Sequence, residues 1–454
     1  MSALLSIGVV TIAATIVSAP VASAVGGPCG QGGNGSLGSI TGSLGSLTGS
    51  LSGSAATGSL MNGLPWITGA PNGALPVLRG RTQAIEMVTG PGSPNDTINR
   101  FSVSGTDLGI MWDNGLPGSE HGVQMAFGDT VGDCDSPGDD WRSNVLFRSS
   151  NTDIANKFRI DSSPKDGPNH SKEIIPEPQF APGFEFTTIP TAGISYDGVQ
   201  YIRIMSVRSW DVPGEWTTNY SALAYSTDNG ENWVVDPVTV RANTGDIDLG
   251  ILGIPAISPI NKNFQQSAFL EGRAEDDGDG FIYEYGTPSG RSGGALLSRV
   301  PGAELRNPLA YEYWNGSGWS ADPDGAVTVI KSPVSELSVQ WNDYLNKYVA
   351  MYTSPRGLVM SQAEHPEGPW SGSQVLVSGA TLPGIYGGFM HPWTSRPGSH
   401  TLEFVATTWD RYNVIYMQTD LTGMGMSGSD SRDRPDPATT GEAELLEMRM
   451  PAEQ

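Results

Sequence analysis

The sequence has few positive charges and very little cysteine or histidine. Its 454 residues include 25 Lys and Arg against 48 Asp and Glu, so the formal net charge is −23. Nucleic-acid binding needs clustered positive charge, and anionic membrane surfaces attract basic proteins, so this balance argues against both partners. With five histidines and no zinc-type cysteine spacing, a metal centre of His and Cys is not expected.

Several catalytic motifs are also missing. There is no Gly-x-Ser-x-Gly elbow, no H-E-x-x-H helix, no Walker loop and no dinucleotide fingerprint. Long helical periodicity is absent too. What the sequence does contain is 59 Gly, 33 Pro and 12 Trp, with short apolar or alternating runs between turn residues. That pattern predicts successive antiparallel strands and a secreted all-β protein.

The two ends differ in composition from the body. Residues 1–24 hold an apolar run, Ala3 to Pro20, before an Ala-x-Ala site, and this predicts a signal peptide and a secreted or cell-envelope location. The run is short for a membrane span and ends at a proline, so we expect no stable membrane insertion. Residues 25–78 are rich in Gly, Ser and Leu and predict a flexible linker. Residues 423–454 predict a disordered acidic tail, with one helical turn around 443–448.

The chain has two cysteines, Cys29 and Cys134. In an oxidising compartment they can pair, which would tie the segment after the signal peptide to an acidic loop. Two free thiols are the alternative, and the sequence leaves both open.

Between the ends lies a body of residues 79–422. Its strand clusters recur near 101–150, 186–240, 264–300, 335–375 and 385–420, and each is the size of a four-stranded propeller blade. Residues 226–233 read STDNGENW, the S-x-D-x-G-x-x-W pattern of the Asp box on propeller turns. We therefore predict an all-β, five-bladed β-propeller. A pair of β-sandwiches is the rival architecture.

Two aspartates are the candidate catalytic residues. Asp107 in GTDLG and Asp129 in FGDTV each stand where an apolar strand meets a Gly-bounded turn. If the innermost strands of the blades line a channel, carboxylates at their ends converge, and paired carboxylates are what glycoside hydrolysis needs. Asp residues also commonly cap turns, so a structural role is the plain alternative. Asp113 is the nearest rival to Asp107.

Polar and aromatic residues near other strand ends are candidate sugar contacts. They are Trp141, Arg142, Asn144, Arg208, Trp210 and His391. Aromatic rings stack on sugar rings, and planar polar groups hydrogen-bond to hydroxyls. For Arg142 a structural ion pair with an aspartate of the acidic loop is equally acceptable. A lone histidine such as His391 is more often structural than catalytic.

The run Glu275-Asp-Asp-Gly-Asp-Gly280 resembles a fragment of a calcium loop but lacks the closing Glu. A solvated acidic turn is the better interpretation. We expect no cofactor, although a structural metal ion in the propeller channel stays an open alternative.

Taken in order, GTDLG, FGDTV, WRSNVLFRSS, MSVRSW and YGGFMHPW resemble an actinobacterial secreted domain once labelled only as of unknown function, whose members are grouped as endo-D-arabinanases, glycoside hydrolase family 183. The similarity covers about 79–422. It implies a five-bladed propeller that cleaves internal α-D-arabinofuranosyl linkages of arabinogalactan and lipoarabinomannan in mycobacterial-type walls. It also implies that two aspartates, here Asp107 and Asp129, catalyse with inversion.

The sequence therefore predicts a monomeric, secreted glycosidase that acts on D-arabinan. A non-catalytic glycan-binding propeller of the cell envelope is the main alternative, and another glycosidase, such as a sialidase or an L-arabinanase, is a third. We expect Asp129 to be the acid, because Phe127 and its apolar strand offer the less polar setting, and Asp107 the base.

Overall fold

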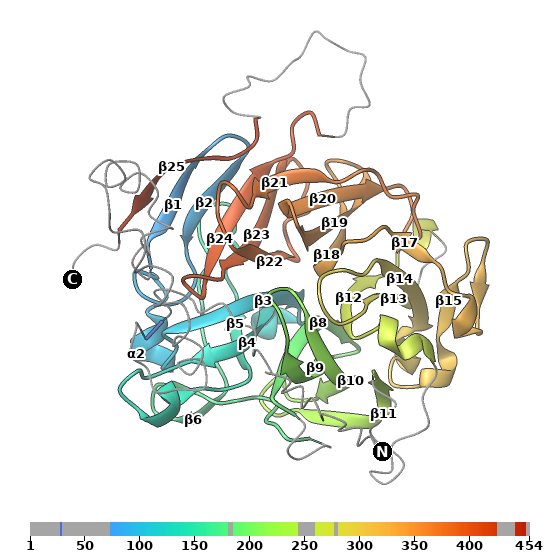
Figure 1. The fold of residues 1–454 in the computed structure, drawn as a ribbon, viewed down its shortest axis with the longest axis horizontal. Helices are drawn as coiled ribbons and strands as arrows, with labels where there is room; N and C mark the ends of the chain where they lie inside the picture. The colour runs from blue at the N-terminus through green and yellow to red at the C-terminus, as the bar shows by residue number, and fades with distance from the viewer. Residues whose placement is uncertain are drawn as a thin grey trace, which may run out of the picture.

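The computed structural model describes residues 28–29, 73–179, 185–243, 259–276, 280–424 and 441–450. These residues form five antiparallel sheets arranged in a ring (Figure 1). The predicted five-bladed propeller is confirmed, and the β-sandwich alternative is wrong. The signal peptide, nearly all of the predicted linker and residues 277–279 of the acidic run lie outside the described residues.

Each predicted strand cluster corresponds to one blade. Blade 1 contains β3 (Gly105–Asp113), β4 (Val123–Val131) and β5 (Val145–Ser149). Blade 2 contains β8 (Thr187–Tyr196), β9 (Val199–Trp210), β10 (Trp216–Ser226) and β11 (Val234–Ala242). Blade 3 contains β12 (Gln266–Glu271), β13 (Phe281–Thr287), β14 (Ala295–Pro301), β15 (Glu312–Trp314) and β16 (Trp319–Ser320), with β17 (Thr328–Ile330) paired to β14.

Blade 4 contains β18 (Ser335–Asn342), β19 (Lys347–Ser354), β20 (Gly357–Ala363) and β21 (Gln374–Ser378). Blade 5 contains β22 (Ile385–Met390), β23 (Thr401–Thr408), β24 (Asn413–Asp420) and β2 (Thr82–Met87). Besides the terminal strands β1 and β25 described below, the elements outside the blades are a hairpin, the short helix α2 (Thr97–Phe101) and several 3₁₀ turns. The hairpin consists of β6 (Lys165–Gly167) and β7 (His170–Ser171), and the turns are η3 (Gly118–Glu120), η4 (Pro137–Asp140), η5 (Pro259–Asn263), η6 (Ala274–Asp276), η7 (Gly302–Glu304), η8 (Pro308–Ala310) and η9 (Pro323–Gly325). Among the described residues no helix has the length and apolar character to cross a membrane.

The ring is closed by a strand from the N-terminal side of the body. β2 pairs with β24, so that Thr82 lies opposite Thr419 and their hydroxyls are 2.8 Å apart. The last blade therefore uses strands from both ends of the body, and opening the ring would cost a full ladder of hydrogen bonds.

The five innermost strands β3, β8, β12, β18 and β22 follow one another around the centre of the ring (Figure 1). β3 and β22 are buried along almost their whole length, because neighbouring blades cover both faces of an inner strand. All five run in the same direction. Their first residues therefore lie at one end of the propeller, which we call the entry end, and their last residues lie at the other, the exit end.

The turn between β10 and β11 has the hydrogen bonds expected of an Asp box. The Asp228 carboxylate accepts from the Asn232 backbone at 2.9 Å, and the Ser226 hydroxyl accepts from the Gly230 backbone at 2.9 Å. The Trp233 ring packs on the edge of Trp112 in blade 1 at 6.5 Å. The motif therefore shapes a turn and attaches it to the neighbouring blade.

The two ends of the described body pair with each other. β1 (Leu75–Arg79) and β25 (Glu444–Arg449) form an antiparallel ladder, and Ala443 and Leu78 are buried against blade 5. The expected helical turn near 443–448 is wrong. Its Glu, Leu and Met are good helix formers, but so short a helix is unstable alone, and pairing with β1 satisfies the backbone instead.

Cys29 and Cys134 are joined by a disulfide with a Cα–Cα distance of 5.2 Å. It attaches residues 28–29 to the acidic loop after β4. An ideal Cβ on Gly105 would lie 2.1 Å from the Pro28 ring, so this segment is packed directly on the start of β3.

Candidate active site

Asp107 lies in an irregular part of β3 at the entry end. The pairing of β3 with β4 shifts on both sides of Leu108, whose φ is +67°, and Gly109 has φ +92°. Such a bulge redirects side chains, and a positive φ at leucine is a strained conformation that the surrounding packing must hold. The Asp107 side chain is turned towards blade 5, where its Oδ2 accepts a 2.8 Å hydrogen bond from the Tyr386 hydroxyl.

The Asp107 carboxyl is buried and closely packed, and this changes its pKa. Burial raises its pKa to about 7, although the hydrogen bond from Tyr386 and the charge of Arg291 oppose the shift. Its Oδ1 is buried and has no hydrogen-bond partner among the described residues. An ideal Cβ on Gly128 would lie 2.4 Å from that oxygen, so only glycine fits beside it. An unpaired buried oxygen at a strained strand is typical of a group kept for chemistry.

Asp129 follows Gly128, near the end of β4. Asp129 therefore lies on the second strand of blade 1. The sequence had predicted that both aspartates lie at the ends of innermost strands, and the structure differs from this prediction at Asp129. Its Oδ1 accepts a 2.5 Å hydrogen bond from the hydroxyl of Thr187, the first residue of β8 in blade 2. Burial raises the pKa of Asp129 well above its usual range, and the charges of Asp107 and Glu177 raise it further.

Tyr412 shows that the two aspartates share one region. It lies in the turn between β23 and β24, and the charges of Asp107 and Asp129 both raise its pKa, after burial. The Asp107 carboxyl faces blade 5 and the Asp129 carboxyl faces blade 2, so the pair stands at the junction of three blades. Both side chains are almost covered, with 8% and 7% of the residue surface exposed.

A second carboxylate–cation pair borders the site. Glu336, near the start of β18, has φ +42° and binds the guanidinium of Arg291 through both oxygens, at 2.6 Å to 3.2 Å. The guanidinium carbon of Arg291 lies 5.0 Å from the Tyr386 ring centre and 5.7 Å from that of Trp216. Arg291 thus lies between Tyr386, which touches Asp107, and the aromatic residues of blade 2.

Trp409 is an exposed aromatic residue that packs on Tyr386 and Tyr412, both of which interact with Asp107. It occupies the turn between β23 and β24, 40% exposed, with its ring centre 5.9 Å from Tyr386 and 6.0 Å from Tyr412. No sequence motif pointed to Trp409, because it lies in a hairpin turn and comes near Asp107 only through Tyr386 and Tyr412, once blade 5 packs against blade 1. Tyr386, by contrast, stood inside the quoted YGGFMHPW motif.

The predicted sugar contacts fall into different places. Trp210 and Arg208 lie on β9 beyond the start of β8, at the entry end, and Trp210 packs on Trp216 at 5.8 Å. Trp141 is half-buried at the end of η4, and its neighbour Arg142 forms a bridge with Thr130, the residue after Asp129. These tryptophans and Arg208 are therefore positioned at the end that holds the aspartates.

Arg142 and Asn144 are engaged in the interior. The Arg142 guanidinium donates to the carbonyl oxygens of Ser171 and Ser102 and lies 3.6 Å from Asp140 of the acidic loop. The Asn144 amide donates to two carbonyl oxygens and accepts from the Ile175 backbone, each at 2.8 Å. Both side chains hold loops in place, and we do not include them among the proposed sugar contacts.

His391 and Asp113 lie at the exit end. His391 directly follows the last residue of β22, whereas Tyr386 lies near the first residue of that strand. The His391 side chain is fully buried between the Phe158 and Trp393 rings. Burial lowers its pKa to about 3, so the ring stays neutral. Asp113 is the last residue of β3, so this rival to Asp107 cannot reach Asp129.

Among the described residues no cluster of three or more His, Cys, Asp or Glu side chains has the geometry to hold a metal ion. The groups that the described residues place at the entry end include two buried carboxyls, tyrosine hydroxyls, a threonine hydroxyl and the Glu336–Arg291 pair.

The fold and the site define a five-bladed propeller with a carboxyl pair at its entry end. Residues 92–418 match the model of the protein family described as Domain of unknown function (DUF4185), and the chain belongs to that family. Among curated proteins it is similar to Notoamide biosynthesis cluster protein J of Aspergillus sp. (strain MF297-2), with 28% identity over 355 residues that cover 72% of this chain and 86% of the relative.

Solved propeller structures are more distant. A glycosyl hydrolase from Bacteroides ovatus has a TM-score of 0.43 and 9% identity, covering 76% of this chain and 94% of that protein. A family 117 glycoside hydrolase from Zobellia galactanivorans has a TM-score of 0.42 and 10% identity, covering 77% and 92%. At these values the similarity carries no conclusion about the reaction.

Proposed function

We propose that the protein is a secreted glycoside hydrolase that cleaves internal α-D-arabinofuranosyl linkages in the D-arabinan of arabinogalactan and lipoarabinomannan, with inversion. The observation that carries the proposal is the pair of buried aspartates, Asp107 and Asp129, whose pKa values are both raised. A glycosidase needs one carboxyl that stays protonated near neutral pH and one that is ionised. The family resemblance of the motifs around both residues supplies the substrate.

Asp129 suits the role of general acid. Its pKa is raised by burial first, and then by the like charges of Asp107, Glu177 and Glu173, with only one opposing hydrogen bond, from Thr187. A carboxyl in such a setting keeps its proton, which it can donate to the leaving glycosidic oxygen.

Asp107 suits the role of general base. The Tyr386 hydroxyl donates to it and the Arg291 guanidinium lies nearby, and both favour its ionised form. Its unpaired Oδ1 is the atom that would accept a proton from the attacking water. The water's oxygen would then form the new bond to the anomeric carbon from the face opposite to the leaving group.

We propose that an arabinofuranosyl unit stacks on the Trp409 ring. Trp409 is the exposed member of the aromatic group that it forms with Tyr386 and Tyr412 beside Asp107. We expect Trp409→Ala to raise KM for D-arabinan about 10-fold with a smaller change in kcat, because stacking binds ground state and transition state alike. Steady-state kinetics on purified variants would measure this. Phe186, which is 52% exposed at the start of β8, gives a comparison variant, Phe186→Ala. An unchanged KM in Trp409→Ala would remove Trp409 from the site.

The other parts of the proposal follow from the sequence. The protein acts outside the cell or in the cell envelope, as a monomer, on a neutral polysaccharide and without a cofactor. The acidic balance of the chain suits a neutral partner, because it offers no attraction for nucleic acid or anionic lipid.

The test is to incubate the purified protein with D-arabinan from mycobacterial arabinogalactan and to follow the products by chromatography and ¹H NMR. We expect oligosaccharides of mixed length early in the reaction, and β-anomeric reducing ends at first, because inversion converts an α linkage to a β product. Monosaccharide as the first product would contradict endo cleavage, and α-anomers would contradict inversion. Binding of arabinan without any product would instead favour the non-catalytic glycan-binding alternative.

A further inference from the structure

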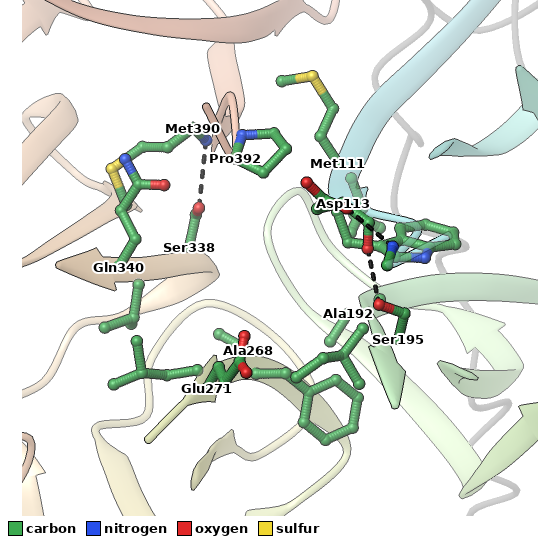
Figure 2. Close-up of a pocket in the computed structure, with 18 of the residues that line it drawn as sticks. Met111, Asp113, Ala192, Ser195, Ala268, Glu271, Ser338, Gln340, Met390 and Pro392 are labelled. Carbon is green, nitrogen blue, oxygen red and sulfur yellow. Dashed lines mark hydrogen bonds between the residues drawn. The ribbon is translucent and has the colours of Figure 1, made fainter. Parts of the chain in front are cut away.

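A cavity of about 980 Å³ opens at the exit end of the propeller, away from Asp107 and Asp129. All five innermost strands contribute to its wall, as Figure 2 shows for Met111, Ala192, Ala268, Ser338 and Met390. Small-molecule sites are usually about 300–1,000 Å³ and combine apolar walls with a few placed polar groups. The cavity is as large as the biggest of these, and the reaction proposed above does not use it.

The mouth of the cavity is mainly acidic. Four carboxylates line it, Asp113, Asp197, Glu271 and Asp343, against one guanidinium, Arg273. Like charge repels, so phosphates, sulfates and uronic acids are poor ligands for it. The charge of the wall therefore favours a ligand that is neutral or positively charged.

Asp113 is a fixed hydrogen-bond acceptor at this mouth (Figure 2). Its Oδ1 accepts from the Gly115 backbone at 2.7 Å, and its Oδ2 accepts from the Trp393 indole at 2.6 Å and faces His121 at 2.9 Å. A carboxylate has about four lone-pair positions, so Asp113 can still accept from a ligand hydroxyl. Holding the group in place beforehand lowers the entropy cost of binding.

Donors stand on the opposite wall. The buried Nε2 of Gln340 has no hydrogen-bond partner among the described residues, although Gln340 lines the cavity. The Arg273 guanidinium is stacked on the Trp341 ring at 3.5 Å, and the Trp341 indole donates to Asp343 at 2.9 Å, so this aromatic–cation pair is also held in place. The cavity thus offers fixed acceptors and donors together, beside apolar surface.

We propose that the exit-end cavity is a second carbohydrate-binding site, which takes a neutral saccharide. A sugar hydroxyl donates and accepts at once, and this matches a wall with both kinds of partner. A cationic ligand would use only the carboxylates and would leave the buried Gln340 amide without a hydrogen-bond partner. Because the site lies at the other end of the ring, it can hold one stretch of a polysaccharide while another is cleaved.

The test uses Asp129→Asn protein, so that no substrate is consumed, with ¹⁵N-labelled tryptophan. Probes are reduced D-arabinan oligosaccharides, maltohexaose and spermidine, followed through the indole N–H signals. Trp393→Phe assigns the signal of the ring that contacts Asp113. We expect a saccharide to shift the Trp393 and Trp341 signals in a saturable way, and Gln340→Ala or Glu271→Gln to weaken that binding at least about 10-fold. Glu364→Gln, an exposed carboxylate outside the cavity wall, is the matched control and should bind as the parent does.

The outcomes separate this proposal from the function of the aspartate pair. Saccharide binding at Trp393 in the Asp129→Asn protein supports it, whether or not the parent protein hydrolyses D-arabinan. Shifts only at Trp409 or Trp216, shifts with spermidine alone, or no shift with either saccharide would each overturn it. So would equal affinity in Gln340→Ala, Glu271→Gln and the control.

Discussion

Asp129→Asn and Asp107→Asn should each lower the rate of D-arabinan hydrolysis by about 10²–10⁴-fold while the propeller stays folded, because each removes one partner of the proton transfer. The exposed aspartate Asp135 in the loop after β4 provides a matched control, and Asp135→Asn should keep full activity. The measurement is the initial rate of reducing-end release, with circular dichroism to check the fold. Full activity in both variants would remove the pair from the mechanism.

Asp107→Asn should also stabilise the folded protein at high pH. The folded-state pKa of Asp107 is raised to about 7, so between pH 4 and 7 the native state binds the proton more tightly than the unfolded chain does. Stability attributable to this carboxyl is therefore greatest at low pH and is lost as the pH rises through about 7. We expect Asp107→Asn to be more stable than the parent at pH 8.5, by as much as about 4 kcal/mol, and equal to it near pH 4.

Activity and stability thus move in opposite directions in one variant, which a purely structural aspartate would not do. Thermal unfolding at the two pH values, beside the activity assay, checks both. A lower Tm for Asp107→Asn at pH 8.5 would show that Asp107 is a structural ion. The activity of the parent should fall below about pH 7, as Asp107 takes up its proton, and again at higher pH as Asp129 loses its own.

Glu284→Gln should destabilise the protein by about 3–5 kcal/mol. Glu284 lies on β13 with no exposed surface and accepts two hydrogen bonds from each of Arg203 and Arg241, all between 2.9 Å and 3.1 Å. Those arginines are on β9 and β11, so the carboxylate joins blade 3 to blade 2. An amide would leave two buried guanidinium groups without a counter-charge, and removing one partner of a buried pair is more costly than the pair itself is worth.

The stability that Glu284 contributes changes with pH in the opposite direction to the stability that Asp107 contributes. The two arginines lower the pKa of Glu284 to about 2, against the effect of burial, so its contribution is complete above about pH 4.5 and is lost as the pH falls through 2. Urea unfolding at pH 7 measures the difference. Glu312→Gln, which removes a 39% exposed partner of Arg299, is the control and should change stability by less than about 1 kcal/mol. A loss below 1 kcal/mol for Glu284→Gln would contradict the argument.

Some structural features followed from local pattern. The five strand clusters became five blades because alternation and turn residues act over a few positions, and each blade is built from consecutive strands except where β2 completes blade 5. The Asp box formed its turn for the same reason, since Ser226, Asp228 and Gly230 satisfy one another within five residues. Asp107 and Asp129 could be selected because each stood in a recognisable motif at a strand end.

Other features depended on contacts between distant segments. The helix formers at 443–448 became strand β25 because β1, more than 360 residues earlier, offered a partner. Arg142 and His391 resembled ligands in the sequence, but loops and rings from elsewhere buried them. The buried group of Arg203, Arg241 and Glu284 had no local signature, since its members lie on three strands of two blades.

What the sequence determined by itself was therefore the strand clusters of the five blades, the number of blades and the two candidate carboxyls, all of which depend on residues close together in the chain. Only the tertiary structure decided which polar side chains face each other across blades. It placed Tyr386 and Trp409 beside Asp107, put Asp129 against blade 2, and separated the exit-end cavity from both. These contacts exist because the blades pack side by side in a closed ring, in which blade 5 meets blade 1 and each inner strand lies between two others.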